Sequence, residues 1–121
     1  MPGAHAKVRE ISVEEFDEMI ENHDDLLIVD VREAGEFERG HIPGAQRLAH
    51  ELLEGEMDDA RHAQLERLFG GRGNTLVLCS HDGVRSAAAA QALQRLGFEK
   101  VYSLAGGVAR WQAQGFALVT E

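Results

Sequence analysis

The residues best suited to chemistry lie in one short stretch, TLVLCSHDGVRSAAAA, which spans residues 75–90. Cys79, the only cysteine of the chain, ends an apolar run, and small and polar residues follow before an alanine-rich segment. A cysteine in such a turn can act as a nucleophile when its thiol is deprotonated. Arg85, at the start of the expected helix, carries a fork of donors that suits an oxyanion. The stretch therefore points to chemistry on a small anion.

The expected turn, residues 80–84, lies between a buried strand and the N-terminus of a helix. Backbone N–H groups at such a place are unpaired, and the helix dipole adds partial positive charge. Gly83 permits a turn with positive φ, so that successive amides can converge on an anion. With Arg85, they would form a cradle for a thiolate, a persulfide, a phosphate or a sulfate. The alternative is an ordinary strand-to-helix turn, in which Cys79 is a small buried hydrophobic residue.

Other arrangements of reactive residues carry less weight. Ser80, His81 and Asp82 spell a hydrolase triad, but neighbours in sequence cannot align as nucleophile, base and orienting group. We expect His81 and Asp82 at the lip of the loop, where they tune access and Asp82 opposes an anion. The six histidines show no metal-ligand spacing, and GGRGN (residues 70–74) lacks the Lys and Ser/Thr of a phosphate-binding loop. No metal or other cofactor is therefore expected.

The elements that must position the loop alternate between strands and helices. Strands are predicted at residues 7–11, 26–31, 45–49, 75–79 and 100–104, and helices at 13–20, 33–40, 58–71, 85–96 and 106–115. The continuous apolar runs at 26–31 and 75–79 are typical of buried parallel strands. This alternation predicts an α/β fold, with a mainly parallel central sheet covered by helices on both faces. Ligands of such sheets bind beyond the carboxyl ends of the strands, where the loop must lie.

Length and composition limit the classes of protein that the chain can belong to. A chain of 121 residues predicts one domain, over residues 1–121. Twelve basic and twenty-one acidic residues give a net charge of −9, which argues against a nucleic-acid or acidic-lipid partner. The N-terminus lacks the apolar run of a secretory signal, and no apolar run is long enough to span a membrane. One cysteine forms no intrachain disulfide, so a reducing, cytoplasmic setting is expected.

Three segments together resemble the rhodanese family of sulfurtransferases. They are DVREAGEFERGHIPGA (residues 30–45), GVRSA (83–87) and LAGGVARW (104–111), and the resemblance covers roughly residues 7 to 117. It implies a compact α/β domain in which a loop cysteine takes sulfane sulfur from thiosulfate or a persulfide. The resulting cysteine persulfide passes this sulfur to a thiophilic acceptor such as a thiol or cyanide. A small anionic donor and a persulfide-carrying protein are the partners that it implies.

Residues around the loop are expected to play supporting roles. Asp30 and Arg32 are expected to organise hydrogen bonds between neighbouring loops, rather than to do chemistry. His41, in the GHIPGA turn, is expected to bond to local backbone. In the loop itself, the amides from His81 to Val84, with the side chain of Arg85, would hold the charged sulfur. Ser86 would cap the helix that follows.

The loop departs from the family pattern at the nucleophile. Rhodanese loops usually read Cys, two variable residues, Gly, one variable residue, Arg, Ser. Aligned on Gly83, Arg85 and Ser86 without a gap, this pattern puts Ser80 at the position of the catalytic cysteine. A serine hydroxyl cannot store sulfur as a persulfide, so this register predicts a chain inactive in sulfur transfer, either an inactive relative or a cysteine-to-serine variant.

Two alternatives remain open at the level of sequence. The chain can be a non-catalytic rhodanese module that binds an anion or a protein partner, which Ser80 favours. In the other register, Cys79 is the nucleophile of a loop one residue longer, Cys79-x5-Arg85. That spacing resembles the rhodanese-like phosphatases and arsenate reductases, although the sequence locates no general acid for such an enzyme. The register with Ser80 is preferred because it needs no insertion.

Overall fold

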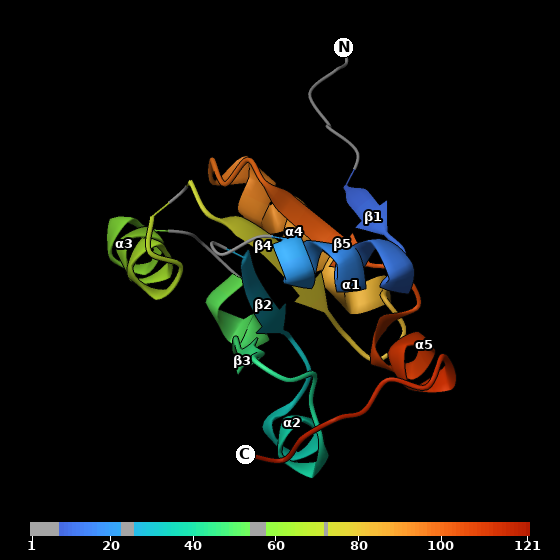
Figure 1. Cartoon of the computed structure of the whole chain (residues 1–121). Helices are drawn as coiled ribbons and strands as arrows, with labels where there is room; N and C mark the ends of the chain where they lie inside the picture. Colours follow the sequence, from blue (N-terminus) through green and yellow to red (C-terminus); the bar gives the residue numbers. More distant parts are fainter. Residues whose placement is uncertain (1–7, 23–25, 54–57, 72) are drawn as a thin grey trace.

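The core of the molecule is a five-stranded sheet in the order β1-β5-β4-β2-β3, with every pair parallel (Figure 1). The computed structural model describes residues 8–22, 26–53, 58–71 and 73–121. The strands are β1 (Arg9–Ile11), β2 (Leu26–Asp30), β3 (Gln46–Arg47), β4 (Thr75–Cys79) and β5 (Val101–Leu104). Every residue of the central strand β4 is buried. Because all strands run the same way, their carboxyl ends meet at one edge of the sheet.

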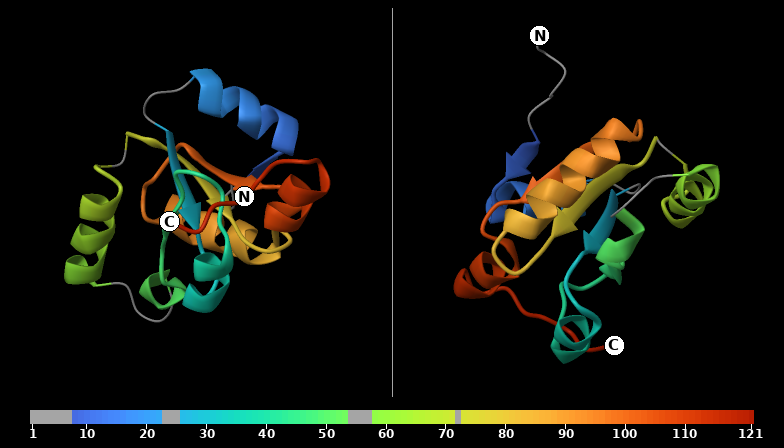
Figure 2. Two further views of the ribbon diagram at one scale, coloured as in Figure 1. Left: turned by 60° about the horizontal axis from the view of Figure 1, so that its bottom comes forward. Right: turned by 180° about the vertical axis from the view of Figure 1, so that it is seen from behind.

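Helices cover both faces of this sheet (Figure 2). Helices α1 (Val13–Asn22) and α5 (Gly107–Ala113) pack on one face, and α3 (Asp59–Leu68) and α4 (Val84–Arg95) pack on the other. The short helix α2 (Ala34–Arg39) follows β2, and a 3-10 helix, η1 (His50–Leu53), follows β3. The predicted fold class is confirmed, and the sheet is wholly rather than mainly parallel.

The two faces of β4 feed two separate apolar clusters, because successive side chains of a strand point to opposite sides. Leu76 and Leu78 belong to the cluster under α3 and α4. Val77 and Cys79 belong to the cluster under α1 and α5, which also holds Trp111. This alternation places the thiol of Cys79 in the core on the α1 and α5 side.

Local sequence signals set several element boundaries. The predicted capping box opens α1: Ser12 Oγ accepts from the N–H of Glu15, and the Glu15 carboxylate accepts from the N–H of Ser12. Gly40 ends α2 as expected, and Gly40 N–H donates to the carbonyl of Phe37.

The predicted strands at both edges are longer than the observed ones. The strand expected at 7–11 begins at Arg9, and the strand expected at 45–49 contains only Gln46–Arg47. Edge strands pair on one side only, so fewer ladder bonds hold their ends. Residues 1–7 lie outside the described residues, as does Arg72 of the predicted turn at 70–74.

Candidate functional site

The loop of interest, residues 80–85, leaves the carboxyl end of β4 and enters α4. Gly83 is the residue before the helix and has φ of 95°, in the left-handed region that glycine adopts at little cost. A Cβ at Gly83 would lie 3.1 Å from both the Gly106 nitrogen and the Leu104 oxygen. Glycine is therefore required here both for the backbone angle and for the close approach of the segment after β5.

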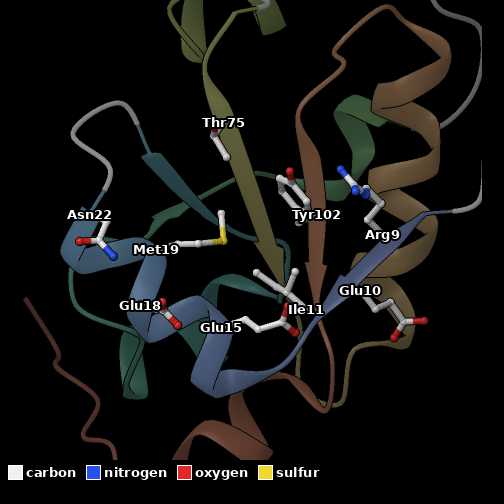
Figure 3. Close-up of a pocket in the computed structure, with 9 residues that line it drawn as sticks. All are labelled: Arg9, Glu10, Ile11, Glu15, Glu18, Met19, Asn22, Thr75 and Tyr102. Atoms are coloured by element: carbon white, nitrogen blue, oxygen red, sulfur yellow. The ribbon is translucent and has the colours of Figure 1, made fainter.

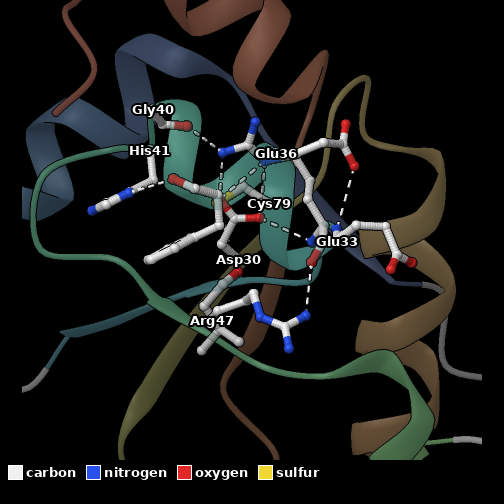
Figure 4. A network of polar contacts seen from close by, with 10 residues as sticks. Asp30, Glu33, Glu36, Gly40, His41, Arg47 and Cys79 are labelled. Atoms are coloured by element: carbon white, nitrogen blue, oxygen red, sulfur yellow. Dashed lines mark hydrogen bonds and ion pairs between the residues drawn. The ribbon is translucent and has the colours of Figure 1, made fainter. Parts of the chain in front are cut away.

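Cys79 is the last residue of β4 and is fully buried, at 0% exposure. Its Sγ lies 3.6 Å from the Val29 carbonyl oxygen, to which the thiol donates (Figure 4). Burial raises the pKa of this thiol far above its usual value, and the nearby carboxylate of Asp30 raises it further. The thiol thus stays protonated, and solvent does not reach it.

Ser80 has the opposite surroundings, although it is also buried, at 2% exposure. Its Oγ accepts hydrogen bonds from the N–H groups of Gly83 and Ser86, each at 3.1 Å. The same hydroxyl donates to Ser86 Oγ at 3.1 Å. The loop therefore winds around the side-chain atom of position 80, and three donors or potential donors converge on that atom.

Ser86 does not cap α4, contrary to the sequence-based expectation. Gly83 is the cap residue, and Ser86 lies in the first turn, where its Oγ donates to the Gly83 carbonyl at 3.2 Å. The Ser80 hydroxyl takes the capping role instead, because it reaches the N–H of Ser86 from outside the helix. The sequence pattern identified Ser86 as part of the motif, but it could not show that the hydroxyl of Ser80 accepts from the N–H of Ser86.

The expectation of unpaired amides throughout residues 80–84 is wrong in part. The N–H of Gly83 is bonded to Ser80 Oγ, and that of Val84 is bonded to Asp82 Oδ1 at 3.1 Å. Within the described part of the chain, no protein group accepts a hydrogen bond from the amides of His81 and Asp82. These two amides are available to a ligand.

Backbone hydrogen bonds join the N-terminus of α5 to the loop. Val108 N–H donates to the Ser80 carbonyl at 2.8 Å, and Ala109 N–H donates to the His81 carbonyl at 2.9 Å. Gly107 has φ of 61°, and a Cβ on this residue would overlap the Ser80 carbonyl oxygen. In the sequence, this Gly-Gly pair is recognisable only as part of the motif LAGGVARW that resembles the family. The structure gives its physical reason, which is the close approach of α5 to the loop.

A buried ion pair braces the neighbouring strand end (Figure 4). Arg32 Nη2 donates to Asp30 Oδ2 at 2.8 Å and to the Gly40 carbonyl at 2.6 Å, and Arg32 Nε donates to Asp30 Oδ1 at 3.0 Å. Burial disfavours the charged guanidinium, but the hydrogen bond and charge of Asp30 outweigh it and raise the pKa of Arg32. The pair ties β2 to the end of α2.

His41 is buried in the turn after α2. Its Nδ1 donates to the Phe37 carbonyl at 2.8 Å, and its ring stacks on Phe37 with centroids 3.8 Å apart. Its backbone also forms an antiparallel bridge with Val119. All of these contacts are with local backbone, with an adjacent ring or with the C-terminal segment.

The mouth of the loop is a hollow of about 190 Å³. Its lining residues are Arg32, Glu36, Ser80, His81, Asp82 and Arg85. Arg85 is half-exposed and lies opposite Glu33, with Nη1 3.7 Å from Glu33 Oε1. Val84, at 73% exposure, points away from the core. The structure thus brings Ser80, His81, Asp82, Arg85 and Arg32 to one opening and leaves Cys79 outside it.

A larger groove of about 570 Å³ lies elsewhere, between α1 and the sheet (Figure 3). Its walls include Arg9, Met19, Thr75 and Tyr102, and Arg9 stacks over the Tyr102 ring. Thr75 begins β4, so this groove opens near the amino ends of the strands, opposite the edge that carries the loop. None of the candidate site residues predicted from the sequence lines this groove.

Neither a membrane-spanning helix nor a metal-binding cluster is present among the described residues. No described helix has the length and apolar character that a bilayer span requires. Among the same residues, no group of three or more His, Cys, Asp or Glu side chains is placed to hold a metal ion.

The fold and the site together define a class of protein: a wholly parallel α/β domain whose central strand feeds an anion-facing loop at a helix N-terminus. The model of the rhodanese-like domain matches residues 12–114, and the chain belongs to that family. A thiosulfate sulfurtransferase, GlpE of Pseudoalteromonas translucida, is 32% identical over 110 residues, which cover 87% of this chain and 90% of that protein. The sequence-based recognition of the family is confirmed.

Further relatives show the range of the family. The putative sulfur carrier protein YrkF of Bacillus subtilis is 32% identical over 88% of this chain and 52% of its own length. The 3-mercaptopyruvate sulfotransferase SseA from Escherichia coli superposes with a TM-score of 0.76 and 26% identity, over 93% of this chain and 51% of that one. A Rhodopseudomonas palustris protein described as a possible tyrosine phosphatase superposes with a TM-score of 0.79 and 26% identity, over 93% of this chain and 85% of that one.

Proposed function

We propose that this chain is a rhodanese-type sulfurtransferase domain, over residues 1–121, whose nucleophile position is occupied by Ser80. One observation carries the proposal: the loop amides converge on the Oγ of Ser80, while the only thiol, Cys79, points into the core. With serine at this position, the chain binds a small sulfur-containing anion and does not carry its sulfur. A reducing, cytoplasmic setting belongs to the same proposal.

The reaction follows once a thiolate stands at position 80. The thiolate attacks the outer sulfur of thiosulfate, an S–S bond forms, and the bond to the sulfonate sulfur breaks, so that sulfite leaves with its electron pair. An acceptor thiolate or cyanide then attacks the terminal sulfur of the persulfide, which regenerates the thiolate. The loop amides and Arg85 would stabilise the negative charge in both steps. The names of the relatives, sulfurtransferase and sulfur carrier, support donors and acceptors of this general kind.

Two other functions receive less support. A non-catalytic module that binds an anion or a protein has the same loop and the same Ser80. It differs from the proposed domain in that a cysteine at position 80 would not take up sulfur. A phosphatase or arsenate reductase that uses Cys79 would need an accessible thiolate. Here the thiol has 0% exposure, and burial raises its pKa. The family likeness to a possible tyrosine phosphatase keeps this function testable.

The first test is the intact mass of the protein after incubation with thiosulfate. We expect the chain as it stands to gain nothing, and Ser80→Cys to gain one sulfur atom that a thiol reductant removes. The double variant Cys79→Ala/Ser80→Cys serves as the control, because it must behave like Ser80→Cys. Uptake by the parent chain that disappears in Cys79→Ala would make Cys79 the nucleophile and overturn the proposal. No uptake by any of these variants would leave only the non-catalytic module.

Arg85 provides a second test of the same loop. Arg85→Ala should weaken binding of thiosulfate or sulfate by about tenfold, because it removes a charge-assisted hydrogen bond. Arg95→Ala is the matched control, since Arg95 is an exposed arginine in the last turn of the same helix. Titration calorimetry measures both. Equal affinities in the parent chain and in Arg85→Ala would remove the loop as the anion site.

A further inference from the structure

The residue behind the loop that the family motifs leave without a role is Ser103. It lies on β5, is fully buried at 0% exposure, and its Oγ is 2.8 Å from Ser86 Oγ. The strand around it, Val101–Leu104, is otherwise apolar apart from half-buried Tyr102. A hydroxyl at a core-facing strand position costs free energy unless it is hydrogen-bonded, and Ser86 is the partner that the described residues offer.

Three buried hydroxyls therefore form a chain: Ser80, Ser86 and Ser103. The two O···O separations are 3.1 Å and 2.8 Å. Counting protons orders the chain. Ser80 donates to Ser86 Oγ, Ser86 donates to the Gly83 carbonyl, and the Ser103 proton then goes to Ser86 Oγ as well.

We infer that Ser103 is a positioning residue, which holds Ser86 ready to donate a hydrogen bond to a negatively charged atom at position 80. This inference rests on the proposed function, because it assumes that position 80 is where the nucleophilic sulfur belongs. A thiolate there carries no proton, so it cannot donate to Ser86 as the Ser80 hydroxyl does. Ser86 must then turn its own hydroxyl from the Gly83 carbonyl toward the thiolate.

Two features lower the free-energy cost of this rotation of the Ser86 hydroxyl. The Gly83 carbonyl keeps a second donor, because Ala87 N–H lies 3.1 Å away. Ser103 continues to donate to Ser86 Oγ, and a hydroxyl that accepts one hydrogen bond is a stronger donor in the next. The thiolate would then accept three hydrogen bonds, from Ser86 Oγ and from the amides of Gly83 and Ser86. Without Ser103, one of these bonds is weakened and Ser86 Oγ loses its buried donor.

The test measures the pKa of the new thiol in Ser80→Cys, from the pH dependence of its alkylation by iodoacetamide, followed by intact mass. Removing Ser103 in the same background, as Ser80→Cys/Ser103→Ala, should raise this pKa by about 0.5 to 1 unit, the size expected for one weakened hydrogen bond. Ser80→Cys/Ser103→Thr keeps the hydroxyl and should restore the lower value. Parent chain treated in the same way corrects for any reaction of Cys79.

Two comparisons separate a positioning role from a structural one. Thr75→Val, also in the Ser80→Cys background, removes a buried hydroxyl at the other end of the neighbouring strand β4 and should leave the pKa unchanged. In a Ser86→Ala background, Ser103→Ala should have no further effect, because the hydrogen-bonded chain is already broken. An unchanged pKa in Ser103→Ala, or an equal shift with and without Ser86, would overturn the inference.

Failure of the inference is distinguishable from failure of the proposed function. If Ser80→Cys takes up sulfur but its pKa ignores Ser103, only the role of Ser103 is wrong. If the pKa responds to Ser103 while Ser80→Cys takes up no sulfur from thiosulfate, the hydroxyl chain stands and the sulfurtransferase proposal fails.

Discussion

The last residue of β4 and the first residue of the loop are both buried and are joined by one peptide bond, but their side chains have opposite surroundings. Cys79 has the more nucleophilic side chain, but it faces the α1 and α5 core and stays protonated. Ser80 has the weaker nucleophile, but two amide donors and the Ser86 hydroxyl surround its Oγ. Reactivity at these two positions therefore depends more on whether the side chain faces the core or the loop than on whether it carries sulfur or oxygen.

The arginines of the two regions show the same contrast. Arg32, at the strand end, is 8% exposed at its side chain and is bound at 2.8 Å to a carboxylate with no exposure. Arg85, at the loop, is 55% exposed and is 3.7 Å from an equally exposed carboxylate. The first pair holds the scaffold, because a buried charge needs its partner. The second leaves its guanidinium available to a ligand, because water screens the pair.

The largest expected effect comes from disrupting the close contact between α5 and the loop. Gly107→Ala should lower the free energy of unfolding by more than about 4 kcal/mol, since a Cβ would overlap the Ser80 carbonyl. Gly115→Ala is the matched control: its φ is 92°, also left-handed, and a Cβ there meets nothing within 4 Å. Its cost should be only the backbone strain, about 1–2 kcal/mol. Chemical denaturation measures both, and equal losses would show that close approach is unimportant.

The two ion pairs should differ next. Asp30→Asn leaves the buried guanidinium of Arg32 without a charged partner and should cost about 3 kcal/mol of stability. Glu33→Gln, at the exposed pair, should change the free energy of unfolding by less than about 0.5 kcal/mol. Urea titrations of both variants test the contrast, which is lost if the two costs are similar.

The last prediction concerns the buried thiol, whose effect appears only in alkaline solution. Because the pKa of Cys79 is raised above its ordinary 9.0, the thiol stays protonated in the folded chain. Below that ordinary value, both states hold the proton and stability is unaffected. Above it, the unfolded chain releases a proton that the folded chain keeps, so stability falls with rising pH by up to about 1.4 kcal/mol per unit.

The parent chain should therefore lose stability more steeply than Cys79→Ala between about pH 9 and about pH 11. Subtracting the two curves removes the contributions of tyrosine and lysine, which both proteins share. Parallel curves would mean that the thiol is open to solvent, and Cys79 would become a credible nucleophile again.

Much of the fold was predictable because its signals are local. The apolar runs at 26–31 and 75–79 needed no partner to indicate buried strands, and Ser12 with Glu15 marked the start of α1. Details that depend on distant contacts were harder to predict. Ser86 was expected to cap α4, but the hydroxyl of Ser80 accepts the hydrogen bond from the N–H of Ser86 in the first turn of the helix. The role of Ser103 was not predictable from the sequence, since its partner Ser86 lies seventeen residues away.

The sequence by itself determined the family, the order of strands and helices, and the position of a glycine-bearing loop before α4. These follow from residue type and spacing along the chain, which short-range sterics and burial translate directly into structure. Only the tertiary structure decided the direction in which neighbouring side chains point and which hydroxyls and amides meet. Those contacts join β4, α4, β5 and α5, and their geometry exists only once the sheet has brought the segments together.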